Sequence, residues 1–431
     1  MKRLICLTLL SAIALFASLD TAKAQVYTQS ESTSFRNDSL FTMPVSLSSE
    51  YSVEVWANQT SNTITAGFMN DLAQGGFISH DIINPILNRH TGPKGYLGAN
   101  AGFNVSWNAA PSDNKTWIMC GSFGSEVIVD SRWTSDLFEL FWYGNASSTG
   151  EVNSLSGTGV RIGAFNRFSL GVLNQETEQR MELSLVQRLS GAEWSLPYGY
   201  LYVSENADSL DSYLQTEARF HMNADSTLLP AYGVGLSGNI PIKSDEFPLE
   251  FNLRFKDVGL LFEPGGSQVY WFQEGASTTG LPIFGDSLTW ESIVTDIAND
   301  EFDFEGDTLV QFGESVSRMV LLPAKLTASL KYVHTDQISF NGSISAGGWM
   351  PKNLISAGVQ FNRTETLDWG VNYRDGGWGD QRFAVWARLK LNENRALYIN
   401  VEEPLGLLFM QDTGAETTCR GITIRLTKQN G

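Results

Sequence analysis

Apolar and polar side chains alternate residue by residue through most of this chain, and this period of two constrains its fold more than any other feature. Such a period places successive side chains on opposite faces of a β-strand. Each run therefore has one apolar and one polar face, and the chain is predicted to be all-β. The clearest runs are 249–256, 326–332, 355–361, 382–391 and 422–426.

Turn-forming residues separate these runs at intervals of roughly ten residues, which suits a tilted strand that crosses a bilayer. Asn341-Gly342 and Asp375-Gly376-Gly377 are two such turns. On this spacing, 96–262 is predicted to hold about ten strands and 320–427 about six or seven more. Lipid cannot satisfy open backbone groups, so strands in a membrane must close into a barrel. The sequence predicts a transmembrane antiparallel up-and-down β-barrel of about 14–16 strands.

The first residues predict export from the cytoplasm. Lys2 and Arg3 precede an apolar run over 4–19, and Ala22-Lys23-Ala24 has the small residues of a cleavage site. The alternative, an N-terminal membrane helix, is disfavoured because the apolar run is short. The predicted organisation is a signal peptide over 1–24 and an outer-membrane β-barrel over 25–431, located in the cell outer membrane.

The charge balance limits the partners. A formal net charge of -18 argues against nucleic acid. The predicted partners are outer-membrane lipid and the barrel-assembly machinery, while the solute or protein partner is not specified by the sequence. After cleavage only Cys120 and Cys419 remain. Two unpaired thiols buried in strands are favoured over a disulfide between them.

Long basic side chains occupy the polar faces of several predicted strands, where the lumen of a barrel is expected. The predicted lumen-lining residues are Arg254, Lys256, Arg382, Arg388 and Lys390. These cations would favour anions, whereas the acidic loop 263–321 would repel them. The sequence therefore predicts no clean selectivity, and an apolar or neutral solute is equally compatible. Tyr and Trp near strand ends are expected to form girdles at the membrane interfaces. The expected girdle residues are Trp107, Trp117, Trp142, Tyr143, Tyr198, Tyr200, Trp349, Trp369, Tyr373, Trp378 and Tyr398.

Two segments interrupt the alternation. Residues 66–91 have the apolar spacing of one or two short helices broken at Gly75-Gly76. These helices would pack in the lumen, cap its periplasmic mouth or cross the surface. Residues 263–321, rich in carboxylates and aromatic rings, are predicted to form a long acidic loop insertion. The predicted partner site in this loop comprises Trp290, Glu301, Asp303, Glu305 and Asp307.

No motif for catalysis or cofactor binding is found. The acidic run 300–307 lacks the spacing of a calcium loop, so a solvated loop is favoured over a metal site. The four histidines show no metal-type spacing, and there is no nucleophile elbow, phosphate loop or dinucleotide fingerprint. The chain is predicted to have no enzymatic activity, no cofactor and no metal.

Five short blocks resemble, in their order along the chain, an uncharacterised outer-membrane β-barrel family of Bacteroidetes. The blocks are GGFIS (75–79), FWYGN (141–145), FKDVG (255–259), LPAKL (322–326) and GGWG (376–379). That family is distantly similar to fatty-acid-transporter-like barrels, and it offers no catalytic or binding residues to carry over. The chain departs from the usual outer-membrane barrel near its C-terminus, where Leu426 stands in place of an aromatic residue.

Three functions are compatible with these features. The first is an outer-membrane barrel for passive or gated passage of small or hydrophobic solutes. The second is a surface or assembly scaffold that transports nothing and presents the acidic loop to a partner. The third is a secreted soluble β-sandwich with a binding role. The barrel is favoured over the sandwich because no linker rich in Pro, Gly or Ser divides the chain into domains.

Overall fold

The fold is given by a computed structural model. The residues that it describes are 33–36, 43–46, 49–75, 78–109, 116–145, 148–206, 209–221, 231–243, 247–265, 268–278, 310–314, 317–362, 366–404 and 417–429.

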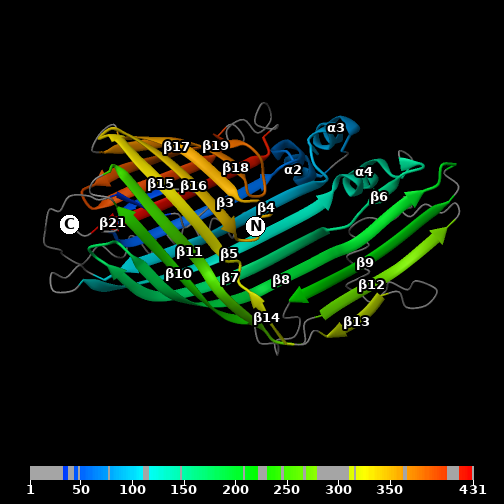
Figure 1. The fold of residues 1–431 in the computed structure, drawn as a ribbon, viewed down its shortest axis with the longest axis horizontal. Coiled ribbons are helices and arrows are strands. Elements are labelled where there is room, and N and C mark those ends of the chain that lie inside the picture. Colours follow the sequence, from blue (N-terminus) through cyan, green and yellow to red (C-terminus); the bar gives the residue numbers. More distant parts are fainter. Residues whose placement is uncertain are drawn as a thin grey trace.

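Fourteen antiparallel strands close into one barrel (Figure 1). The last strand pairs with the first, so that Thr423 lies opposite Trp56. The pairing joins the two ends of the sheet, as a membrane-spanning sheet requires. In order around the ring the strands are β3 (Ser49–Ser61), β4 (Lys94–Asn108), β5 (Trp117–Thr134), β7 (Thr158–Asn174), β8 (Arg180–Val203), β10 (Ala231–Lys243), β11 (Leu249–Glu263), β15 (Lys325–Thr335), β16 (Ile338–Gly347), β17 (Leu354–Asn362), β18 (Leu367–Gly376), β19 (Arg382–Asn392), β20 (Arg395–Glu402) and β21 (Cys419–Gln429).

Strand β8 extends beyond the ring, and a small sheet continues from it. Its first half pairs with β10, whereas its second half pairs with β9 (Leu210–His221). Strand β9 pairs with β12 (Gln268–Thr278), which pairs with β13 (Val310–Glu314). The short β6 (Val152–Ser154) lies against the far end of β8. We call β6, β9, β12, β13 and the second half of β8 the extension, which projects to the right in Figure 1. A separate pair of short strands, β1 (Thr33–Arg36) and β2 (Met43–Ser46), precedes the ring.

The predicted number of strands in the segment 96–262 was wrong. The segment 96–262 carries the ring strands β4, β5, β7, β8, β10 and β11, with β6 and β9 outside the ring, so the expected count of about ten strands there was too high. The reason is strand length: β5, β7 and β8 have 18, 17 and 24 residues. The segment 320–427 carries β15 to β21, as predicted.

The predicted loop 263–321 is not a loop throughout. It contains β12, β13 and the short β14 (Arg318–Leu321). Strands β14 and β15 pair with β11 in one register, with Leu321 opposite Leu260 and Leu326 opposite Phe255. They are two halves of one ring strand, interrupted around Pro323, which cannot donate a backbone hydrogen bond.

The two ends of the barrel carry connections of very different length. At the short-loop end, where β3 begins and β21 ends, the strands are joined by 109–116, 175–179, 244–248, 336–337, 363–366 and 393–394. At the long-loop end the connections are 62–93, 135–157, 204–230, 264–317, 348–353, 377–381 and 403–418. Outer-membrane barrels have this asymmetry, with short turns on the periplasmic side and longer loops outside the cell.

Among the described residues, three short helices lie at the long-loop end: α2 (Ala66–Gln74), α3 (His80–Asn88) and α4 (Ser135–Tyr143). The predicted break at Gly75 is confirmed. Gly75 ends α2 with a φ of 74°, which glycine adopts at little cost. The Thr65 hydroxyl caps the start of α2 by accepting from the Phe68 amide at 3.2 Å. The helices pack through an apolar cluster of Ile64, Phe68, Ile83, Ile86 and Phe138.

No helix in the described part of the chain is long and apolar enough to span a membrane.

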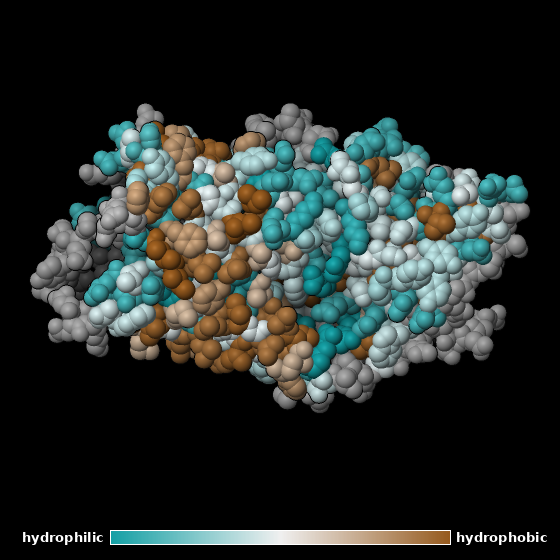
Figure 2. Space-filling model, in the orientation of Figure 1, coloured by the Kyte–Doolittle hydropathy of each residue, from teal (hydrophilic) through white to brown (hydrophobic). Residues whose placement is uncertain are grey.

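The ring is polar inside and apolar outside. Along β21, Thr423 and Arg425 are 0% and 2% exposed, whereas Ile422 and Ile424 are 37% and 38% exposed. Figure 2 shows apolar residues gathered over the ring strands, while the extension is mostly hydrophilic. A water-soluble protein has the opposite arrangement and rarely exposes large contiguous apolar patches. The closed ring replaces the β-sandwich that the sequence left open.

Two further predictions on single residues are resolved. Cys120 and Cys419 are both buried and form no disulfide with each other, as predicted. Trp378 and Tyr398 do not belong to a girdle, because they are 4% and 1% exposed and face the interior. The Trp378 indole donates to Asp130 at 2.9 Å, and this partner accounts for its inward orientation.

Candidate functional site

The inward faces of the strands carry an extended set of ion pairs. These pairs connect strands around the barrel and compensate charges that are largely removed from water. They include Arg425–Glu54, Arg374–Glu402, Arg161–Asp130 at 2.7 Å, Arg188–Glu263 at 2.7 Å and Arg388–Asp368 at 3.3 Å, with the neck pairs described below.

The predicted lumen-lining residues lie on these inward faces. Arg254 is buried and donates to the Asn239 side chain at 3.4 Å. Arg382 and Arg388 are also buried, and half-buried Lys390 follows them on the same face of β19. Lys256 lies on β11 beside Arg254. The five side chains do not line one cavity, because Arg254 and Lys256 line a cavity to which the three residues of β19 do not contribute.

Two cavities lie along the interior. The cavity of about 80 Å³ includes Arg180 and Arg254 among its lining residues, and Arg180 follows the short connection 175–179. The cavity of about 50 Å³ includes Gly348 and Trp378, which belong to connections of the long-loop end. We call them the lower cavity and the upper cavity. The same four charged residues line both: Glu126, Arg167, Lys256 and Asp257.

These four residues, here called the charged neck, stand between the cavities and are joined by ion pairs. Arg167 lies 2.8 Å from a carboxylate oxygen of Glu126 and 2.7 Å from one of Asp257. The Lys256 ammonium lies 3.5 Å from Glu126. Their side chains come from β5, β7 and β11, so the neck spans three strands of the ring wall. Each cation of the neck is paired with at least one of its carboxylates.

A β-bulge makes the neck possible. The register of β10 with β11 shifts between Leu236 and Gly238, and Asp257 has a φ of 53°. The Asp257 amide donates to the Ser237 hydroxyl at 3.0 Å. Because the bulge adds one residue, Lys256 and the next residue both face the interior. A positive φ is uncommon for residues other than glycine, and such backbone conformations are often found at functional sites.

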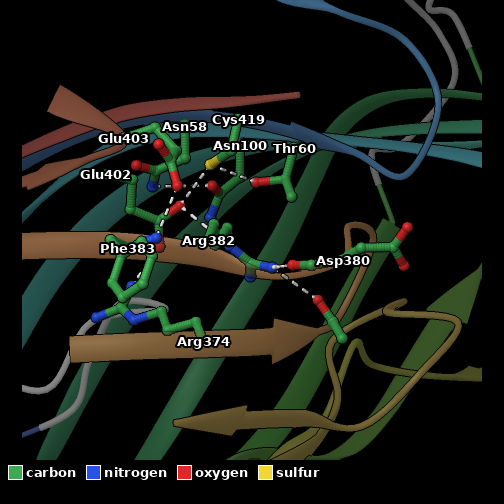
Figure 3. Close-up of polar contacts among 11 residues, drawn as sticks. Asn58, Thr60, Asn100, Arg374, Asp380, Arg382, Phe383, Glu402, Glu403 and Cys419 are labelled. Atoms are coloured by element: carbon green, nitrogen blue, oxygen red, sulfur yellow. Dashed lines mark hydrogen bonds and ion pairs between the residues drawn. The ribbon is translucent and has the colours of Figure 1, made fainter. Parts of the chain in front are cut away.

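A second buried cluster surrounds Glu402 (Figure 3). Its carboxylate is 0% exposed, pairs with Arg374 and lies 3.8 Å from Arg382. The Cys419 thiol donates to it at 3.0 Å and lies 3.3 Å from the Thr60 hydroxyl. This cluster joins the neighbouring strands β18 to β21 and β3, so it stabilises the wall of the barrel.

The predicted partner site of the acidic segment lies outside the described residues and stays a prediction. It comprises Trp290, Glu301, Asp303, Glu305 and Asp307.

Three of the five sequence blocks meet at the upper cavity. Lys256 and Asp257 come from the block 255–259, Pro323 and Lys325 from 322–326, and Trp378 from 376–379. Sequence reasoning missed Glu126, Arg167 and Asp257 as members of one site. The usable signal was Asp257, a charged residue that breaks the alternation of β11.

His90, beside α3, gives the long-loop end a testable pH dependence. Its Nε2 accepts from the Trp133 indole at 3.0 Å, and its Nδ1 lies 3.0 Å from the Ile86 carbonyl, so the docked ring is neutral. Burial lowers its pKa below 6.5. Protonation therefore favours the undocked state, and the packing of α3 is expected to weaken as pH falls below 6.5. Proteolysis at α3 should rise in acid in the wild type but not in His90→Phe. Equal pH profiles would contradict this role.

No protein-family model and no curated protein sequence matches this chain. Solved structures similar to it include a FadL homologue of Pseudomonas aeruginosa, with 10% identity, 89% of this chain and 91% of that chain covered, and a TM-score of 0.40. The toluene transporter TodX of Pseudomonas putida has 10% identity, 88% and 86% coverage and a TM-score of 0.35. A porin of Rhodopseudomonas blastica has 6% identity, 88% and 99% coverage and a TM-score of 0.23.

Proposed function

We propose that this chain is an outer-membrane barrel that passes small solutes through its polar interior, and that the charged neck gates the passage. The single observation that carries the proposal is the pair of cavities on either side of the neck, which share Glu126, Arg167, Lys256 and Asp257. An interior filled completely by side chains would leave no such cavities. The apolar outer face supports the membrane location.

The orientation follows from the connections. Short turns belong on the periplasmic side and long loops outside the cell, so the lower cavity would open toward the periplasm. The upper cavity, the helices and the extension would lie toward the medium. The proposal includes Arg254 and Lys256 as residues that line the passage. It also includes a partner outside the cell that the acidic segment binds.

The size of the cavities indicates a closed state. A water molecule needs about 10–15 Å³ of such volume, so 80 Å³ holds roughly five to eight waters and 50 Å³ roughly three to five. Passage therefore requires the neck pairs to separate. A lumen that admits water screens charges, so separation costs far less there than in a dry protein core.

The competing function is a plugged scaffold, which the many ion pairs of the interior favour. Current through single molecules in planar bilayers separates the two. The wild type is expected to show rare openings of low conductance. The double variant Glu126→Ala/Arg167→Ala removes one anion and one cation from the neck, and its unit conductance is expected to rise severalfold.

The matched control is Asp368→Ala/Arg388→Ala, which removes an inward-facing ion pair at 3.3 Å that lines neither cavity. This variant should conduct like the wild type. If the neck variant inserts as a folded barrel and the current stays that of the bare bilayer, the scaffold is the better account.

A further inference from the structure

Two lysines lie directly opposite each other in the wall of the upper cavity. In the register of β11 with β15, Lys325 is the partner of Lys256, and both side chains line the cavity. Like charges at directly opposed positions of an antiparallel pair are destabilising. This arrangement calls for a compensating negative charge.

Only one of the two lysines forms an ion pair with a carboxylate. Five charged residues line the upper cavity: Glu126, Arg167, Lys256, Asp257 and Lys325. The first four form the pairs of the neck, including Lys256 with Glu126 at 3.5 Å. The Lys325 side chain makes no hydrogen bond and no ion pair with any residue that the structure describes, and Glu126 attracts it only from beyond ion-pair distance. Counted at their formal charges, the five side chains leave one surplus positive charge on the cavity wall.

The cavity also offers a second donor. The Asn100 side-chain amide lines it and donates one N–H to Glu126 at 3.4 Å, which leaves its other N–H for a ligand. The Trp378 indole is already used by Asp130 and adds an apolar wall. A volume of about 50 Å³ admits a group the size of a few waters. A compact oxyanion meets these conditions, because it accepts several hydrogen bonds and compensates an ammonium.

We propose that the upper cavity binds a small oxyanion, a phosphate or a carboxylate group, with Lys325 as the principal charge partner. The inference deepens the proposed function and rests on it for its physiological role. The site lies on the long-loop side of the neck, so it would concentrate anionic solutes before the gate. Binding next to Lys256 would also compete with Glu126 for that ammonium and so loosen a neck pair.

Calorimetry with inorganic phosphate on the full-length folded protein in detergent tests the site directly. The wild type is expected to bind one phosphate, and Lys325→Gln to bind it at least about tenfold more weakly. Lys325→Arg should retain binding, because it keeps the charge. The matched control is Lys352→Gln, an exposed lysine of the same end that pairs with Asp380 at 3.4 Å; its affinity should not change.

Equal affinity in the wild type and Lys325→Gln would overturn the site, and so would the absence of phosphate binding to the wild type. Folding of each variant is checked by its heat-dependent gel mobility, and Lys325→Met replaces any variant that fails this check. Conductance separates the two proposals. Phosphate binding that depends on Lys325, without current in any neck variant, would support the anion site and contradict the proposal of gated passage. Current in the neck variant, without phosphate binding to the wild type, would support gated passage and contradict the anion site.

Discussion

Leu330→Arg is expected to destabilise the folded barrel by about 2–4 kcal/mol in a lipid bilayer. Leu330 lies at the middle of β15, 48% exposed, on the outward face. If that face contacts lipid, the guanidinium must enter the apolar layer near its centre, where a cation is most costly. In water the same substitution on a strand surface would change stability by about 0.5 kcal/mol or less.

Val152→Arg is the matched control. Val152 is 64% exposed, but β6 pairs only with the far end of β8, in the extension. Its arginine is expected to face water and to change stability by less than about 0.5 kcal/mol. Urea titration of both variants in vesicles, followed by gel mobility, gives the comparison. If Leu330→Arg proves as mild as Val152→Arg, the outward face of β15 does not contact lipid.

Glu402→Leu is expected to cost about 3–5 kcal/mol, because removing one partner leaves a buried charge uncompensated. The carboxylate is 0% exposed and compensates Arg374 and Arg382, which are 1% and 3% exposed. The variant also removes the acceptor of the Cys419 thiol. Unlike the neck, this cluster joins adjacent strands, so the loss should appear as stability and not as conductance.

A double-mutant cycle sharpens this prediction. Glu402→Leu/Arg374→Leu removes both members of the pair and is expected to be more stable than Glu402→Leu alone. Asp380→Ala provides the exposed reference. Asp380 pairs with Lys352, and the two side chains are 50% and 47% exposed, so the pair contributes at most about 1 kcal/mol. A loss at Glu402 no larger than that at Asp380 would show that the interior is well solvated.

The fold was predictable because the alternation reports a local property. Each run such as 382–391 fixes its own two faces, and the turns between runs fix an up-and-down order. The change of partner along β8 was not predictable, because its only mark is a one-residue slip of the alternation at Leu189 and Ser190, which an ordinary β-bulge also produces. Which strand β8 pairs with depends on its register with segments that are distant in sequence, and the pattern of one strand does not determine that register.

The same distinction applies to the candidate site. The faces of Arg254 and Arg388 followed from parity within a strand. The neck did not, because it joins side chains that are far apart in sequence, such as Glu126 and Asp257. Parity also places Asp257 on the outward face, and only the bulge opposite Leu236 and Gly238 turns it inward. Lys325 follows the interruption at Pro323, and its opposition to Lys256 appears only in the paired strands.

Membrane fractionation of the full-length protein, with gel mobility before and after boiling, tests most directly whether this closed ring with a polar interior spans the outer membrane. We expect recovery in the outer-membrane fraction and a band that migrates faster until it is boiled, as a closed barrel does. Recovery in the soluble or extracellular fraction, with one mobility before and after boiling, would contradict the membrane location and with it the gated passage.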